Sequence, residues 1–209
     1  MSTNTITTHQ KKILSTQNVI NIGMLSAISF VLMYFDFPLP LFPEFLKIDL
    51  SDIPAVIGTF ALGPIAGIFI ELIKNLLYLV IKGTSSGGIG EVANFIVGIS
   101  YIVPLGMVLK WSKNEKRSLY GVIIGLVSML VVGAIGNYFF FIPAYSRFYG
   151  MPIESFVSMS NVVNPLVTDF KTMVLFAITP FNLIKGTVIS IAGYYLYQML
   201  KPAILRMKK

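Results

Sequence analysis

Long apolar runs separated by short polar stretches dominate this chain. Runs of about 20 apolar residues are long enough to cross the hydrocarbon core of a bilayer as helices. The pattern therefore predicts an all-α polytopic membrane protein with six transmembrane helices. We expect these helices at residues 19–35, 52–62, 63–82, 91–109, 119–142 and 180–200.

The second expected helix, residues 52–62, is short for a membrane span. At a rise of about 1.5 Å per residue it covers little more than half of a core that is about 30 Å thick. Gly63 and Pro64 separate it from the next helix. We expect either that the two helices share one tilted crossing or that surrounding protein shields the short one.

Residues 143–179 form a long segment between the fifth and sixth expected helices. Its apolar residues are irregularly spaced, so two arrangements remain open. The segment could lie along the interface as an amphipathic helix broken at Pro165, or it could fold over the mouth of a cavity. Thr179 and Pro180 fit the cap and first turn of the sixth helix.

Composition agrees with a protein that lies mostly in lipid. Of 209 residues, 55% are hydrophobic and 12% are charged, whereas a soluble domain carries about a quarter charged residues. We expect one membrane domain, residues 1–209, crossing the cell membrane several times. There is no cysteine, and the one histidine, His9, lies in a polar tail. We expect neither a metal site nor a cofactor.

Basic residues predict the orientation. Ten of the 16 Lys and Arg residues fall in three regions that six crossings place on the same side. The positive-inside rule makes that side cytoplasmic, so both termini, including the tail at residues 1–17, should face the cytoplasm and residues 143–179 the exterior. Because basic residues flank apolar runs, the net charge of +7 indicates anionic lipid rather than nucleic acid. The basic residues concerned are Lys11, Lys12, Lys110, Lys113, Lys116, Arg117, Lys201, Arg206, Lys208 and Lys209.

Five polar residues in apolar segments carry the functional prediction: Asn75, Asn94, Asn137, Asn182 and Lys185. Each falls near the outer end of its helix, and a polar group in hydrocarbon needs a partner. Each asparagine could instead form a hydrogen bond between helices, but their common depth favours one solute site. Amides match the imide edge of a flavin-like ring, and nearby aromatic residues such as Phe141 could stack on it.

Other features allow alternatives. Gly87 and its glycine neighbours could bring backbone N–H groups close to a ligand or form a plain turn. Glu71 and Lys74 are spaced as a local ion pair on one helix. An intramembrane enzyme using Glu71, Glu91 or Asp169 is disfavoured, because no paired nucleophile and base or metal-ligand set accompanies them. No phosphate-binding loop is present, so uphill transport would need partners or an ion gradient.

Several stretches resemble the substrate-binding S components of energy-coupling-factor (ECF) vitamin transporters, and among these the riboflavin-specific members. The matching stretches are PEFLKIDLSDIPAVIG (43–58), KNLL (74–77), GGIGEVANFIVG (87–98), GNYFF (136–140) and PFNLIKG (180–186). The resemblance covers nearly the whole chain and implies a six-helix fold with an outward-facing vitamin pocket capped by the loop after the first helix.

The resemblance also implies roles for particular residues. Riboflavin would be held at Asn137, Asn182 and Lys185, and in the matching loop at Leu46, Lys47 and Asp49. A separate membrane coupling subunit and two ATPase subunits would be the partners. The family's coupling face is rich in small residues, which here implies Gly23 and Ala27. An S component for another vitamin remains the alternative.

Overall fold

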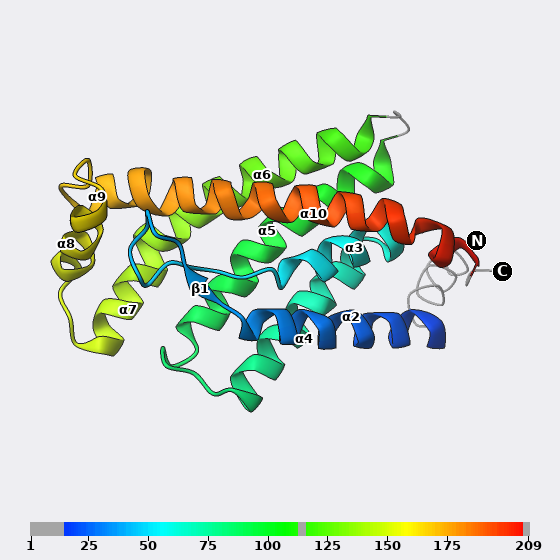
Figure 1. Cartoon of the computed structure of the whole chain (residues 1–209), viewed down its shortest axis with the longest axis horizontal. Coiled ribbons are helices and arrows are strands. Elements are labelled where there is room, and N and C mark those ends of the chain that lie inside the picture. Colours follow the sequence, from blue (N-terminus) through cyan, green and yellow to red (C-terminus); the bar gives the residue numbers. More distant parts are fainter. Residues whose placement is uncertain (1–14, 113–115, 207–209) are drawn as a thin grey trace, which may run out of the picture.

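The computed structural model describes residues 15–112 and 116–206, which form a bundle of long helices (Figure 1). The N-terminal tail and several basic residues used to predict orientation lie outside the described residues. The elements are α2 (Thr16–Tyr34), β1 (Phe37–Pro38), β2 (Lys47–Ile48), α3 (Asp52–Leu62), α4 (Pro64–Ile81), α5 (Ile89–Trp111), α6 (Arg117–Gly136), the π-helix η1 (Asn137–Phe141), α7 (Ile142–Tyr149), α8 (Ile153–Val163), α9 (Phe170–Met173), the π-helix η2 (Val174–Ile178) and α10 (Thr179–Arg206).

The architecture is that of an all-α polytopic membrane protein. Five described helices are long and apolar enough to cross a membrane, at Thr16–Tyr34, Pro64–Ile81, Ile89–Trp111, Arg117–Tyr149 and Phe170–Leu200. The remaining one of the six expected helices, the second in chain order, is α3, which has only 11 residues. The two short strands β1 and β2 pair antiparallel in the loop after α2 and are a minor addition to the helical fold.

Helix α3 is shielded by protein on all sides. Figure 1 shows it beginning near the middle of the bundle and ending at the same end as the start of α2. Every residue from Asp52 to Thr59 is buried, as expected for a helix that is apolar all round. The loop at residues 35–51 fills the other half of this path. Shielding by protein, one of the two alternatives for the short helix, is therefore the one observed.

The expected ends of the fifth and sixth helices are wrong. The fifth helix does not stop at Ile142 but continues through η1 and α7 to Tyr149, and the last helix begins at Phe170 rather than Pro180. Asp169, not Thr179, caps it: the Asp169 carboxylate accepts from the backbone N–H of Thr172 at 2.7 Å, and this bond lowers the pKa of Asp169. The connection that was expected at residues 143–179 is thus largely confined to residues 150–169.

Pro180 is tolerated inside the last helix for a specific reason. A proline has no N–H and so frees the carbonyl four residues earlier, here that of Phe176. The Asn164 side-chain amide donates to this Phe176 oxygen at 3.0 Å, which replaces the missing helical bond. The π-helical turn η2 lies immediately before Pro180, where local widening of the helix accommodates the break in the pattern.

Helix α8 ends at Val163, before Pro165, as expected. It packs over the loop rather than away from the bundle: the Phe156 ring is buried and meets the Phe45 ring edge-on, with 5.5 Å between centroids. A second core forms here around Ile142, Phe156, Val167, Met173, Val174, Ala177 and Ile178. The contact with Phe45 favours the second alternative for this segment, a fold over the mouth of a cavity.

Candidate ligand-binding site

One cavity of about 150 Å³ lies where the loop after α2, the first half of α5, and the two π-helical regions meet. Asn137 opens η1, Ile142 directly follows it, and Ile178 closes η2, so both π-helical turns contribute to the wall. Such turns occur often at functional sites because they redirect side chains. The lining residues are Phe45, Leu46, Lys47, Asp52, Gly90, Ala93, Asn94, Val97, Gly98, Asn137, Ile142, Tyr145, Ile178, Phe181, Asn182 and Lys185.

Most of the polar residues singled out in the sequence meet at this cavity. Three of the four asparagines line it together with Lys185, and the loop residues Leu46 and Lys47 line it as well. The side chains come from α5, η1, α10 and the loop, which are far apart in the sequence. The structure thus brings three amides and one ammonium from separate elements together at one cavity.

Asn75 does not line the cavity but contacts a residue that does. Its amide donates to the backbone oxygen of Glu71 at 2.8 Å and to Asn94 Oδ1 at 3.4 Å. It thus orients Asn94, which does line the cavity. Asn75 therefore fits the alternative of a hydrogen bond between helices better than direct contact with a solute.

Three other expected site residues do not line the cavity. Asp49 is buried and paired with Lys185. Phe141 packs against its own helix, where a Cβ on Gly136 would approach the Phe141 ring within 2.6 Å. Gly87 has a φ of +63°, and an added Cβ would lie 2.5 Å from Phe148. Position 87 therefore requires a glycine, both for the positive φ of the turn and for the space that the Phe148 ring occupies. Gly90, from the same glycine-rich stretch, is the glycine that lines the cavity.

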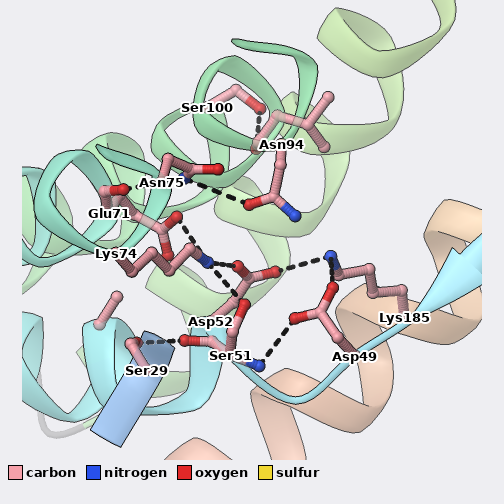
Figure 2. Close-up of polar contacts among 12 residues, drawn as sticks. Ser29, Asp49, Ser51, Asp52, Glu71, Lys74, Asn75, Asn94, Ser100 and Lys185 are labelled. Carbon is pink, nitrogen blue, oxygen red and sulfur yellow. Dashed lines mark hydrogen bonds and ion pairs between the residues drawn. The ribbon is translucent and has the colours of Figure 1, made fainter. Parts of the chain in front are cut away.

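The sequence analysis missed Asp52, although it lines the cavity and joins two lysines (Figure 2). Asp52 Oδ1 pairs with Lys74, and Asp52 Oδ2 lies 3.2 Å from Lys185 Nζ. Its position at the start of an apolar helix was the available signal, because an intramembrane carboxylate needs a cation partner.

Asp52 belongs to a larger group that we name the buried charge cluster, with members Asp49, Asp52, Glu71, Lys74 and Lys185. Lys185 Nζ lies 3.1 Å from Asp49 Oδ2, and Lys74 Nζ lies 2.8 Å from Glu71 Oε2, as the spacing of Glu71 and Lys74 predicted. Ser51 supports the cluster, since its hydroxyl accepts from Lys74 at 2.9 Å and its N–H donates to Asp49 Oδ1 at 2.8 Å. All five charged side chains are buried, and Figure 2 shows them as an alternating row.

Close helix packing places Asn182 at the cavity. A Cβ added to Gly133 of α6 would lie only 2.9 Å from Asn182 Nδ2. The absence of a side chain at Gly133 therefore gives the amide its space. On the same helix, Asn137 Nδ2 donates to the Gly133 oxygen at 2.8 Å, which leaves Asn137 Oδ1 available as an acceptor. The two amides are thus positioned by one glycine.

The wall can both donate and accept hydrogen bonds. Lys185 donates to Asp49 at 3.1 Å and forms an ion pair with Asp52 at 3.2 Å. Because its ammonium has three N–H groups, a donor remains available to a ligand. Phe45, Tyr145 and Phe181 supply aromatic surface. The cavity is smaller than the roughly 300–1,000 Å³ usual for small-molecule sites. A ligand of that class must therefore displace lining side chains or the loop that carries Phe45 to Lys47.

None of the carboxylates considered for an enzyme lines the cavity. Glu71 is in the buried charge cluster, Glu91 accepts from Thr84 Oγ1 at 3.1 Å, and Asp169 caps the last helix. These three carboxylates lie in different surroundings and do not form with one another the pair that general acid–base chemistry would need.

Fold and site together define a multi-pass membrane protein that encloses a polar and aromatic cavity between its helices. The chain belongs to the family of ECF transporter substrate-specific components, whose family model matches residues 17–197. The family consists of transporter components rather than enzymes.

Named relatives cover nearly the full length. The chain is 38% identical to the "Riboflavin transporter FmnP" of Bacillus subtilis (strain 168) over 90% of this chain and 94% of that protein. It is 37% identical to the "Riboflavin transporter RibU" of Staphylococcus aureus (strain TCH60), over 88% and 90%. A solved structure described as "Structure and mechanism of the S component of a bacterial ECF transporter" aligns with a TM-score of 0.69 and 34% identity, covering 89% of this chain and 96% of that one.

Proposed function

We propose that this chain is the riboflavin-binding subunit of an ECF-type uptake transporter. The observation that carries the proposal is the meeting of Asn94, Asn137, Asn182 and Lys185 in one cavity. Their amides and ammonium supply donors and acceptors for the carbonyl, imide and hydroxyl groups of riboflavin, and the aromatic wall can stack on its ring. Relatives over about 90% of the chain carry the name riboflavin transporter.

Within this proposal the expected site residues have distinct roles. Asn137, Asn182, Lys185 and Asn94 contact the ligand directly, as do Leu46 and Lys47 from the loop. Asp49 and Asn75 act through the residues they pair with, Lys185 and Asn94. Phe141 and Gly87 support the helix and the turn that border the site.

The test is direct binding by the purified full-length protein, followed through the change in riboflavin fluorescence. Asn182→Ala should weaken binding at least about tenfold, or about 1.4 kcal/mol, because a buried amide partner is lost. Gln198→Ala is the matched control: Gln198 is exposed and lies four turns further along α10, so its removal should leave affinity unchanged. Tight binding of another vitamin without riboflavin binding would keep the family and overturn the substrate.

For the membrane topology we propose six membrane-embedded helices, with α3 and the loop before it making one passage together. Both termini, including residues 1–17, would be cytoplasmic, and the connection around α8 would be extracellular. The start of α2, the end of α10, the end of α5 and the start of α6 lie at one end of the molecule in Figure 1. This common end supports the orientation, because the basic residues cluster in these three regions.

The coupling partners would dock on α2. Gly23 and Ala27 are exposed on a face that also carries Ile20, Met24 and Ile28, and an added Cβ at Gly23 meets no atom within 4 Å. We propose that this face contacts the membrane coupling subunit, which acts with two ATPase subunits. Small residues there permit close helix approach.

This surface can be tested without disturbing the cavity. Gly23→Trp should retain riboflavin affinity, because Gly23 is exposed and packs against nothing, and should reduce co-purification with the coupling complex at least about tenfold. Val127→Trp, on the exposed face of α6, is the control for adding a large apolar side chain. Equal assembly by the two variants would remove α2 as the docking face.

A further inference from the structure

Glu71 differs from the other members of the buried charge cluster. Each Asp52 oxygen faces a different lysine, and both Asp49 oxygens have partners. Among the described residues, only Glu71 Oε1, Glu71 Oε2 and Asn75 Oδ1 are buried side-chain atoms without a hydrogen-bond partner. Glu71 Oε2 lies 2.8 Å from Lys74 Nζ as an ion pair, but neither Glu71 oxygen has a hydrogen-bond partner.

The net charge of the buried charge cluster is a second reason to examine Glu71. Three carboxylates face two ammonium groups, so the fully ionised cluster carries one excess negative charge. Glu71 and Lys74 are both 0% exposed, and an uncompensated charge at such a site is strongly unfavourable. One proton on one carboxylate makes the cluster neutral. Glu71 is the carboxylate with the weakest set of partners.

The groups that face Glu71 come from every neighbouring element. Its own helix supplies Lys74 and Asn75, and α3 supplies Asp52. Lys185 of α10 pairs with Asp52, and Asp49 of the loop pairs in turn with Lys185. Helix α5 contributes the backbone of Gly98, where an added Cβ would lie 2.7 Å from Glu71 Oε2. From α2 the Ser29 hydroxyl donates to the Ser51 backbone oxygen, so Ser29 contacts Ser51 and not Glu71 itself.

A protonated Glu71 also provides a donor where acceptors lack one. A carboxylic acid has an O–H that can donate, while its other oxygen remains an acceptor. Asn75 Oδ1, the remaining unpartnered acceptor, belongs to the residue one turn further along α4. The proton therefore removes the excess charge and adds a donor to a group of buried oxygens that have no hydrogen-bond partner.

This site is connected to the cavity by three of its neighbours. Asn75 donates to Asn94, which lines the cavity, and Gly98 and Asp52 line it directly. We propose that Glu71 is held as a neutral carboxylic acid and that its proton sets the charge of the cavity wall, which makes ligand affinity depend on pH. The affinity statement rests on the proposed riboflavin function; the statement about the proton does not.

Infrared spectroscopy of the purified full-length protein without ligand tests the proton directly. At neutral pH the wild type should show the carbonyl band of a protonated carboxylic acid, and Glu71→Gln should lose it. Glu91→Gln is the matched control, since Glu91 is also buried but hydrogen-bonded outside the cluster, and it should keep the band. An identical band in wild type and Glu71→Gln, or no band in the wild type, overturns the proposal.

Riboflavin titrations between about pH 6 and pH 9 test the coupling. Loss of the Glu71 proton adds negative charge that holds Lys185 toward the carboxylates, so wild-type affinity should be constant at low pH. It should fall by about fivefold or more as the pH rises, the lower range of coupling between two sites. Glu71→Gln should bind like the wild type at low pH and show no such fall. Parallel profiles, or a flat wild-type profile, overturn the coupling.

Stability provides a third, independent outcome. Glutamine is neutral and nearly isosteric with the protonated acid, so Glu71→Gln should melt at the wild-type temperature at neutral pH. A strongly destabilised or unfolded Glu71→Gln variant would mean that a buried negative charge had been removed, which overturns the proposal. Absence of riboflavin binding in all variants would instead contradict the proposed function, while the infrared band would still decide the state of Glu71.

Discussion

Two charge clusters in this protein use similar distances in different surroundings. In the buried charge cluster Lys185 Nζ lies 3.1 Å from Asp49 and 3.2 Å from Asp52. In the second, which we name the outer charge cluster, Asp36 lies 3.2 Å from Lys47 and 3.3 Å from Lys82. The Lys74 side chain is 0% exposed, whereas that of Lys47 is 52% exposed. Distance alone therefore does not distinguish them.

The comparison shows that burial decides what an ion pair does. In the outer charge cluster water competes with each contact, and Lys82 has additional partners in the rings of Tyr34 and Tyr78, each 4.6 Å away. In the buried charge cluster water does not compete with the contacts, so removal of Asp52 leaves two lysines with fewer anionic partners in a low-dielectric site. The buried charge cluster consequently fixes the position of Lys185 at the cavity.

Removing the central carboxylate should have the largest effect on stability. Asp52→Asn should lower the free energy of unfolding by about 3 kcal/mol, the lower end of the cost of breaking a buried pair, because Lys185 keeps its contact with Asp49 and Lys74 keeps its contact with Glu71. Equilibrium unfolding in mixed detergent measures this. The loss should persist at high salt, since a buried pair is poorly screened. A change smaller than that of the outer substitution described next would contradict the comparison.

The matched substitution in the outer charge cluster should have a small effect. Asp36→Asn removes both contacts to Lys47 and Lys82 but should cost only about 0.2–1 kcal/mol, the range of exposed pairs. The same unfolding measurement should show this difference shrinking as salt is added. A loss comparable to that of Asp52→Asn, or one insensitive to salt, would mean that the outer loop contributes more to the fold than its exposure indicates.

Local patterns allowed some elements to be predicted well. The i,i+3 spacing predicted the Glu71–Lys74 ion pair, and Pro165 correctly predicted that α8 ends before it. The boundary at Pro180 was wrong for a reason outside local sequence. The carbonyl freed by this proline is satisfied by Asn164, twelve residues from Phe176, and no helix-end rule contains such a partner.

Polar residues within the apolar segments allowed part of the site to be predicted, but not all of it. The amides and Lys185 were recognisable because each interrupts an apolar run. Asp52 was not assigned to the site because it resembles an ordinary first-turn acid at a helix start. Its lysine partners Lys74 and Lys185 belong to two other helices, and α3 starts near the middle of the bundle rather than at one of its ends (Figure 1).

The sequence by itself determined that this chain forms apolar helices crossing a membrane, and which polar side chains require partners there. These conclusions depend on the cost of exposing backbone and polar groups to hydrocarbon, which is set residue by residue. The tertiary structure alone decided which polar groups meet. Asn182 reaches the cavity through the space at Gly133, and Lys185 is held by a carboxylate 136 residues away. Such contacts depend on how the helices pack, because packing brings together groups that local spacing cannot relate.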